Sequence, residues 1–246
     1  MNIALIGYGK MGKAIHEIAE SRGHTISAIV NSKNPIEQAD FSTTDVAIEF
    51  STPDLVLKHI NILLEQGIKT VVGTTGWNEH LTEVTARVNN QNGALLHASN
   101  FSVGVNLFMQ LNEYLAQLMN AHKEYYVSME EIHHIQKLDA PSGTAITLAE
   151  GIITHHDAVS NWSCPQHPTK SAFNGGVEIQ AIREPEVPGT HTVNYTSEID
   201  TLSITHQAHS RKGFATGSVI AAEWLYPKQG VFTMRDVLAI PTLKSI

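Results

Sequence analysis

Ionisable side chains are concentrated in one stretch, which reads Glu131-Ile132-His133-His134-Ile135-Gln136-Lys137-Leu138-Asp139. Imidazole and ammonium groups are common proton donors in enzymes. The pattern predicts a strand followed by a loop, and successive strand residues face opposite sides of a sheet. His133 and His134 should therefore take different tasks, one facing a cleft as an acid and the other contacting substrate or packing. A second cation near Lys137 would favour release of its proton, so we expect Lys137 and one of the two histidines to be catalytic.

The next residues, Ala140-Pro141-Ser142-Gly143-Thr144, are typical of the start of a helix. Ser142 is a suitable N-cap. The N–H groups of Gly143 and Thr144 have no partner within such a helix, and they would bind an anion. We expect that anion to be a substrate carboxylate, bound by Ser142, Gly143 and Thr144.

Zinc binding is the alternative chemistry for the adjacent histidines. His133 and His134 point apart if they lie on a strand, and the single cysteine, Cys164, is remote in sequence. A tetrahedral site needs converging ligands. We therefore expect no metal.

A glycine-rich motif lies near the start of the chain, where Gly7-Tyr8-Gly9-Lys10-Met11-Gly12 follows an apolar strand and opens a helix. This is the context in which G-x-G-x-x-G binds a dinucleotide. Gly7 makes the tight turn, Gly9 lets the backbone approach a pyrophosphate, and Gly12 lets helix and strand pack closely. The sequence therefore predicts a nicotinamide cofactor, NADH or NADPH.

Three further segments are expected at the cofactor. The loops Gly73-Thr74-Thr75-Gly76 and Ala98-Ser99-Asn100-Phe101 both follow strands, on the side of a parallel sheet where ligands bind. The second strand ends in Val30-Asn31-Ser32-Lys33, without the carboxylate that often holds a ribose diol. Asn31 can bond the diol and Lys33 can accept a 2′-phosphate, which leaves both cofactors open.

The first hundred residues alternate between short apolar runs and segments of helical periodicity. This alternation is typical of a Rossmann-type, doubly wound parallel sheet of the α/β class. The expected strands are 3–6, 25–30, 46–50, 70–72 and 94–98, and the expected helices are 11–22, 53–66 and 78–90.

The pattern changes after residue 102. It predicts a second, α+β domain with a mixed or antiparallel sheet, followed by a helix over 213–226. The expected helices of this domain are 103–119 and 142–154, the strands are 125–133, 177–182, 191–195 and 202–206, and 155–176 is a loop. We assign 1–101 and 213–246 to dinucleotide binding, and 102–212 to substrate binding and oligomerisation.

Composition excludes several classes of partner. The 246 residues carry a formal net charge of −8, which gives no electrostatic footprint for nucleic acid. No stretch approaches the 18 or so apolar residues of a membrane span, and the start of the chain does not read as a signal peptide. One cysteine, Cys164, allows no internal disulfide. We expect a cytoplasmic protein with no membrane partner.

Residues 131–144 resemble the signature E-x-H-H-x-x-K-x-D-A-P-S-G-T of the 4-hydroxy-tetrahydrodipicolinate reductases, also called dihydrodipicolinate reductases. The resemblance covers nearly the whole chain. Further segments that stand in family order are Gly7–Gly12, Gly73–Gly76, Asn100–Asn106, Ile204–His206 and Ser210–Arg211.

The resemblance implies that NADH or NADPH delivers a hydride to a cyclic dicarboxylic imine on the route to diaminopimelate and lysine. It makes His133 the proton donor and acceptor and Lys137 the second donor. It also places the substrate carboxylates on His134, Gly143 and Thr144. A homotetramer formed through the second-domain sheets is implied as well.

Two segments depart from the family pattern. The segment 31–45, which connects the second and third expected strands, is short and lacks the usual acidic residue. The segment Arg183–Gly189 is rich in Pro and Glu, where the family usually has a glycine-rich turn. The alternatives are another NAD(P)-dependent amino- or oxo-acid dehydrogenase, such as an aspartate dehydrogenase, and a nucleotide-sensing module without catalysis. The histidine and lysine cluster argues against the sensing module.

Overall fold

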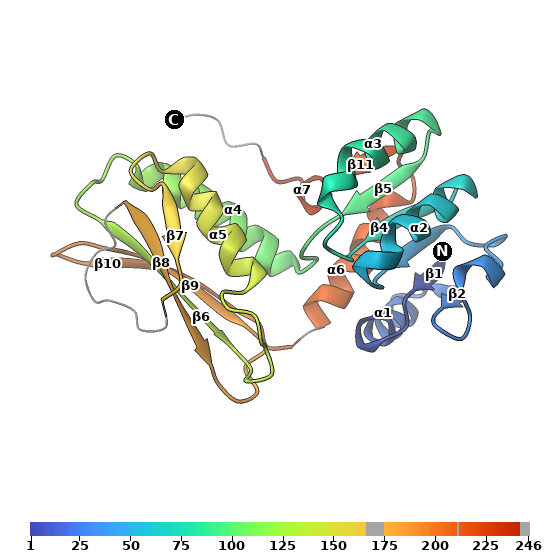
Figure 1. The fold of residues 1–246 in the computed structure, drawn as a ribbon, viewed down its shortest axis with the longest axis horizontal. Coiled ribbons are helices and arrows are strands. Elements are labelled where there is room, and N and C mark those ends of the chain that lie inside the picture. Colours follow the sequence, from blue (N-terminus) through green and yellow to red (C-terminus); the bar gives the residue numbers. More distant parts are fainter. Residues whose placement is uncertain (166–174, 211, 242–246) are drawn as a thin grey trace. The chain divides into compact units, whose positions relative to one another are not determined.

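The computed structural model describes residues 1–165, 175–210 and 212–241, which form two compact units (Figure 1). One unit contains Met1–Val103 and Lys212–Pro241, and the other contains the described residues from 104 to 210. The expected loop and the two expected domains also include residues 166–174, 211 and 242–246, which lie outside the described residues.

The first unit is built on a six-stranded parallel sheet with the order β11-β5-β4-β3-β1-β2. Its strands are mostly buried apolar runs, as parallel strands covered on both faces must be. Their bounds are β1 Asn2–Ile6, β2 Thr25–Val30, β3 Val46–Glu49, β4 Lys69–Val72, β5 Ala94–His97 and β11 Gly230–Phe232.

Helices cover both faces of this sheet, which confirms the doubly wound prediction. Alternate strand residues point to opposite faces: Leu5 packs in a cluster with α1 and α6, and Ala4 packs with α2. The helix bounds are α1 Lys10–Ser21, α2 Pro53–Glu65, α3 Leu81–Asn90, α6 Lys212–Leu225 and α7 Met234–Val237, with 3₁₀ turns at Ile36–Gln38 and Asn78–His80.

The second unit is a five-stranded mixed sheet, as predicted, with the order β10-β9-β6-β8-β7. Strand β6 runs parallel to β8 and antiparallel to β9. Both described helices of the unit contribute to one buried cluster with β6, β8 and β9, so they lie on one face of the sheet (Figure 1). The bounds are α4 Val103–Met119, β6 Tyr126–His133, α5 Gly143–His155, β7 Asn161–Ser163, β8 Gly176–Arg183, β9 Thr190–Thr196 and β10 Thr201–Gln207.

The sequence missed the shortest elements. Strand β7 lies inside the expected loop over 155–176, and β11 and α7 lie beyond the last predicted helix. A strand of three residues is too short to show periodicity, so pairing with a neighbouring strand defines it. The predicted helix over 78–90 is divided into a 3₁₀ turn and α3.

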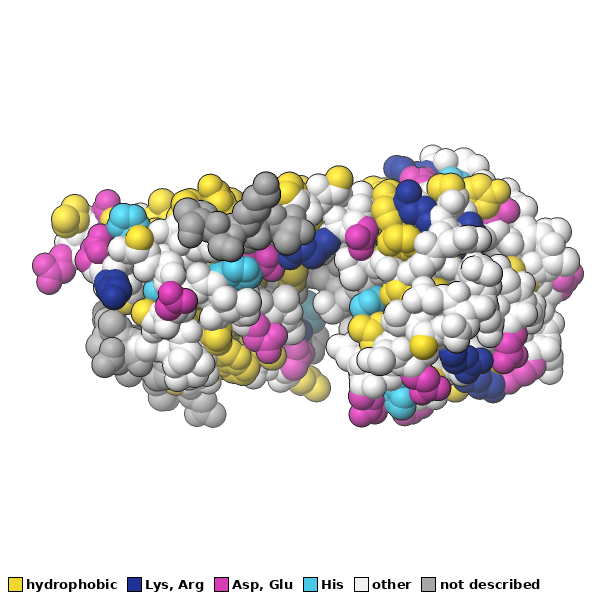
Figure 2. All heavy atoms as spheres, turned by 90° about the horizontal axis from the view of Figure 1, so that it is seen from above, with side chains coloured by type: hydrophobic (Ala, Val, Ile, Leu, Met, Phe, Trp, Pro, Cys, Tyr) yellow, Lys and Arg dark blue, Asp and Glu magenta, His cyan; other side chains and the backbone are white. Residues whose placement is uncertain are grey.

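The molecular surface shows mixed charge. On the face drawn in Figure 2, Lys and Arg side chains are scattered among Asp and Glu side chains and form no broad basic patch. No helix among the described residues has the length and apolar character needed to span a membrane.

Candidate active site

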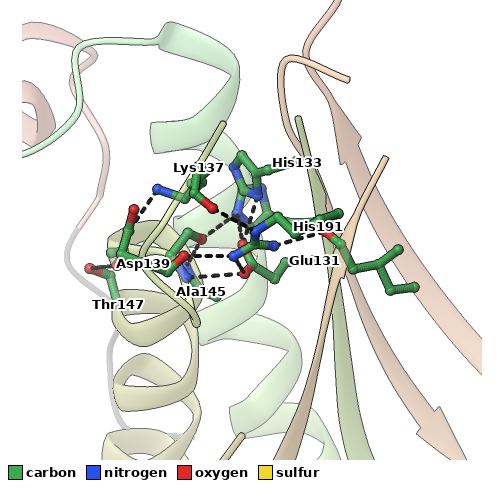
Figure 3. A network of polar contacts seen from close by, with 11 residues as sticks. Glu131, His133, Lys137, Asp139, Ala145, Thr147 and His191 are labelled. Carbon is green, nitrogen blue, oxygen red and sulfur yellow. Dashed lines mark hydrogen bonds and ion pairs between the residues drawn. The ribbon is translucent and has the colours of Figure 1, made fainter. Parts of the chain in front are cut away.

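A buried carboxylate, Glu131, stands at the centre of the polar network in the second unit (Figure 3). Alternation along β6 turns Glu131 and His133 toward the interior, and Glu131 is fully buried. Its Oε1 accepts hydrogen bonds from Nη2 of Arg183 at 3.0 Å and from the N–H of Ser142 at 3.2 Å. Its Oε2 lies 2.8 Å from Nδ1 of His133. One side chain thus links β6, β8 and the start of α5.

Arg183 also holds the loop that follows β6. Its Nη2 donates to the carbonyl oxygen of Asp139 at 2.6 Å, and its Nε donates to that of Lys137 at 3.2 Å. These bonds fix the backbone that carries the predicted proton donor. Arg183 is therefore a structural partner of the site that the sequence did not single out for a role.

The orientation of His133 follows from its neighbours. Only 8% of the residue is exposed, and its Nδ1 faces Glu131. Its Nε2 lies beside Gly189, where an added Cβ would approach it to 3.0 Å. The ring meets that of His191 edge to face, with centroids 5.1 Å apart. Nε2 is thus the nitrogen directed away from the carboxylate.

His191, on β9, connects this network to the start of α5. Its Nε2 lies 3.1 Å from Oγ of Ser142, and the same hydroxyl oxygen accepts the N–H of Ala145, which confirms Ser142 as the N-cap. Ser142 is 3% exposed, so its hydroxyl and its N–H are both used inside the protein. Both polar groups of Ser142 thus have partners within the protein, and its direct contact with substrate stays a prediction.

Burial and hydrogen bonding set the charge states of this network. Burial alone would raise the pKa of Glu131, but the bonds from His133, Ser142 and Arg183 outweigh it and lower the pKa to about 2. Burial lowers the pKa of His191 to about 4, with a further contribution from His133. Near neutral pH the network holds a carboxylate beside a neutral His191.

Lys137 has a different partner from the one expected. The sequence suggested a neighbouring cation, but Nζ of Lys137 donates to Oδ2 of Asp139 at 2.7 Å (Figure 3). This bond is the first cause of the lowered pKa of Asp139. Asp139 is only two residues from Lys137 in the same loop, and this loop includes a turn in which the N–H of Lys137 donates to the carbonyl of His134.

The predicted anion site lies at the first turn of α5. Gly143 is exposed, and an added Cβ there would meet no atom within 4 Å. Open space therefore lies beside the Cα of Gly143. His134 follows the last residue of β6 and is half-buried, whereas His133 is buried. The two histidines thus differ in environment, as alternation predicts.

In the first unit, the glycine motif has the conformation that a dinucleotide loop needs. Gly7 has φ +97°, and a Cβ there would lie 2.1 Å from the carbonyl oxygen of Phe50. A Cβ on Gly12 would lie 2.2 Å from the carbonyl oxygen of Gly7, so helix and loop pack as closely as the motif predicts. Gly9 and Lys10 are exposed, and Gly9 faces open space. The loop therefore fits a pyrophosphate.

The other loops predicted at the cofactor lie at the same edge of the sheet, after the carboxyl ends of β4 and β5. The exposed positions include Thr75 and Ser99, and the buried ones are Thr74, Asn100 and Phe101. Tyr8 bonds Nδ1 of His16 through its hydroxyl. The oxygen of the Asn31 side chain accepts the N–H groups of Lys33 and Asn34, so it is already bonded within its own turn.

Two family models match the chain one after the other. The model described as dihydrodipicolinate reductase, N-terminus, matches residues 1–101, and the model described as dihydrodipicolinate reductase, C-terminus, matches residues 104–238. The chain belongs to the dihydrodipicolinate reductase family.

Relatives support this membership along nearly the full chain. The 4-hydroxy-tetrahydrodipicolinate reductase of Christiangramia forsetii is 46% identical over 97% of this chain and 98% of its own length. That of Thermosipho africanus is 32% identical, with coverage of 97% and 98%. Among solved structures, the dipicolinate-bound dihydrodipicolinate reductase from Paenisporosarcina sp. TG-14 has a TM-score of 0.75 over 96% of this chain and 98% of that one, at 22% identity, which supports the fold.

Both halves of the chain match dihydrodipicolinate reductase models. The two alternatives raised by the sequence, another amino- or oxo-acid dehydrogenase and a nucleotide-sensing module, are therefore not favoured. Sequence reasoning still missed His191 and Arg183 as parts of the site. A signal was available for His191, since it occupies an inward position in an alternating strand. Arg183 ends β8 opposite His133, a register that the sequence does not display.

The residues that could bind a metal in the structure differ from the pair His133 and His134 considered in the sequence. Among the described residues, Glu131, His133 and His191 offer possible ligand atoms that all lie within 4.8 Å of one another. The guanidinium of Arg183 already supplies positive charge 3.0 Å from that carboxylate, and it would repel a cation. We therefore propose a metal-independent site. Stoichiometric zinc in the purified protein would contradict this.

We expect the folded state to lose stability as the pH falls from about 6.5 to about 4. The pKa of His191 is about 4 when folded and 6.5 as its ordinary value, so protons bind the unfolded chain preferentially in this window. The full contribution of His191 is about 3 kcal/mol. Burial lowers the pKa of His97, His156 and His206 in the same direction.

Urea unfolding at a series of pH values measures this loss. His191→Asn should flatten part of the decline, because that side chain no longer titrates. His122→Asn is the matched control, since the His122 side chain is 57% exposed. Equal slopes in the wild-type and His191→Asn proteins would show that His191 titrates normally.

Proposed function

We propose that this protein reduces 4-hydroxy-tetrahydrodipicolinate to tetrahydrodipicolinate with NADH or NADPH, a step of diaminopimelate and lysine biosynthesis. One observation carries the proposal. In a chain that belongs to the family from end to end, His133 and the first turn of α5 meet at one buried carboxylate, and Arg183 ties the Lys137 loop to it. Proton donors and an anion site are thus held by a single network.

The reaction replaces a ring hydroxyl with hydrogen, so a hydride and a proton are taken up and water leaves. Bound NADH or NADPH supplies the hydride. The chain supplies the proton: Glu131 holds Nδ1 of His133 and leaves Nε2 for exchange. Lys137 is the second donor, and Asp139 fixes its Nζ.

The substrate carboxylates bind at the start of α5. The N–H groups of Gly143 and Thr144 point out of the helix and carry its positive end. His134, at the end of β6, adds a further polar group. Bound there, a cyclic dicarboxylate is positioned by the same network that orients His133.

The two predicted domains divide the work. The domain of residues 1–101 and 213–246 binds the dinucleotide, with Gly7–Gly12 on the pyrophosphate and the loops Gly73–Thr75 and Ala98–Phe101 near the nicotinamide. The domain of residues 102–212 binds the substrate. Asn31 and Lys33 stand at the end of β2, where a ribose or a 2′-phosphate is recognised.

We also propose a cytoplasmic homotetramer. Helices α4 and α5 lie on one face of the five-stranded sheet, and among the described residues of this unit no helix covers the other face, which we assign to assembly. The exposed Leu202 of β10 is an apolar side chain at its edge strand. The lone Cys164 suits a reducing compartment. Light scattering after gel filtration measures the mass, and a monomer would contradict the tetramer.

We expect NADH or NADPH to be oxidised when the protein is coupled to the condensation of pyruvate with aspartate semialdehyde. The coupled enzyme supplies the substrate, and loss of absorbance at the cofactor band follows the reaction. Omission of aspartate semialdehyde is the control. Folded protein that oxidises neither cofactor in the complete mixture would refute the proposed function.

A further inference from the structure

Three polar side chains in the first unit form a buried cluster outside the Glu131 network. Glu49 ends β3, Ser51 follows it, and His59 lies on α2. Glu49 is fully buried and His59 is 5% exposed. The hydroxyl of Ser51 donates to Oε1 of Glu49. Nδ1 of His59 lies 3.2 Å from that carboxylate oxygen and 3.2 Å from the Ser51 hydroxyl.

The order of these bonds argues against a nucleophilic serine. In a Ser-His-acid triad the histidine stands between the other two and takes the serine proton. Here the Ser51 hydroxyl donates its hydrogen bond to Glu49 directly, and one nitrogen of His59 faces both oxygens. The cluster therefore fixes the position of Ser51 and does not activate it.

Glu49 stands between the strands that lead into two of the cofactor loops. In the register of the sheet it pairs with Ile6 of β1 and with Val72 of β4. These are the residues before Gly7 and Gly73. The carbonyl oxygen of Glu49 accepts the N–H of Gly73 at 2.8 Å, so the cluster is bonded to the start of the second loop.

Phe50, between Glu49 and Ser51, contacts all three predicted cofactor loops, which are Gly7–Gly12, Gly73–Gly76 and Ala98–Phe101. Its carbonyl oxygen would meet a Cβ on Gly7 at 2.1 Å, and its ring would meet one on Gly73 at 2.1 Å. The ring also packs against Phe101, with centroids 5.6 Å apart. A shift of Phe50 would therefore displace each loop.

Ser51 makes a further bond to the second loop. Its N–H donates to Oγ1 of Thr74 at 2.8 Å. The indole N–H of Trp77 donates to the carbonyl of the same threonine. Thr74, in the turn between β4 and α3, is thus bonded both by Ser51 of the cluster and by Trp77.

We infer that Glu49, His59 and Ser51 are positioning residues that hold the three loops in the arrangement that binds the nicotinamide dinucleotide. This inference rests on the proposed function. Hydrogen bonds to a buried carboxylate are stronger than neutral ones. Their loss should loosen Phe50 and Ser51 and weaken cofactor binding, while the Glu131 network in the other unit keeps its proton donors.

Direct titration with NADH and with NADPH, followed by cofactor fluorescence, tests the inference without turnover. We expect Glu49→Gln to raise the Kd of the preferred cofactor about tenfold, the scale of a lost hydrogen bond to a charged group. In the assay, KM for the cofactor should rise with it, while kcat at saturation stays within about twofold. Ser51→Ala, which removes only a hydroxyl, should raise Kd about threefold or more.

Glu223→Gln is the matched control in the same unit. It breaks the ion pairs of Glu223 with Arg22 and His24, near the start of β2 and away from the three loops. It should lower the melting temperature without changing Kd. Unchanged Kd in both Glu49→Gln and Ser51→Ala would overturn the inference alone. Failure of the wild-type protein to bind either cofactor would overturn the proposed function together with it.

Discussion

Lys137→Ala and His133→Ala should each lower kcat by about 100-fold or more, the scale of general acid catalysis. Both residues lie in the second unit and are held by the same network: Glu131 faces Nδ1 of His133, and Asp139 binds Nζ of Lys137. Neither lies in the glycine loops of the first unit. The Kd of the cofactor should therefore stay within about twofold of the wild-type value.

Conservative replacements separate proton transfer from charge and packing. Lys137→Arg keeps a cation that can pair with Asp139, but a guanidinium does not give up its proton. It should be nearly as slow as Lys137→Ala. His133→Gln keeps polar groups in the buried site without an exchangeable ring proton, and it should behave like His133→Ala. Near-normal kcat in Lys137→Arg would mean that Lys137 acts as a positive charge only.

The sequence could predict those parts of the site that depend on local order. Gly7 and Gly9 lie between β1 and α1, and Gly12 lies in the first turn of α1, so the shape of this motif is set within a few residues. The same holds for Ser142, whose capping of α5 depends on the next three residues. The doubly wound and mixed sheets were predictable for a similar reason, because periodicity and apolar runs mark the longer elements.

Long-range partners could not be predicted in this way. His191 lies 49 residues from Ser142, and Arg183 lies 52 residues from Glu131. Their contacts are created by the pairing of β6 with β8 and β9. Neighbouring residues in the sequence were also a poor guide for Lys137. Nearby cations suggested a repulsive environment for its ammonium group, but the loop places the Asp139 carboxylate against that group.

Glu131→Gln should lower kcat about 10- to 100-fold and destabilise the fold by about 3 kcal/mol, because it breaks a buried ion pair while leaving a partner charge behind. Arg183 would lose the carboxylate at 3.0 Å, and His133 would lose the group that faces Nδ1. The loop bonds of Arg183 would weaken in turn. Steady-state kinetics and urea unfolding measure the two effects.

The pH dependence of stability tests the lowered pKa of Glu131. Its pKa is about 2 when folded and 4.5 as its ordinary value, so the unfolded chain binds the proton first as the pH falls. The stability that Glu131 contributes is fully present above about pH 4.5 and is lost between there and about pH 2. Glu131→Gln should lack this decline. Glu130→Gln, on the opposite face of the same strand, is the matched control, and it should retain both the decline and the wild-type kcat. If Glu131→Gln kept the acid decline and full activity, the central place of this carboxylate in the site would be wrong.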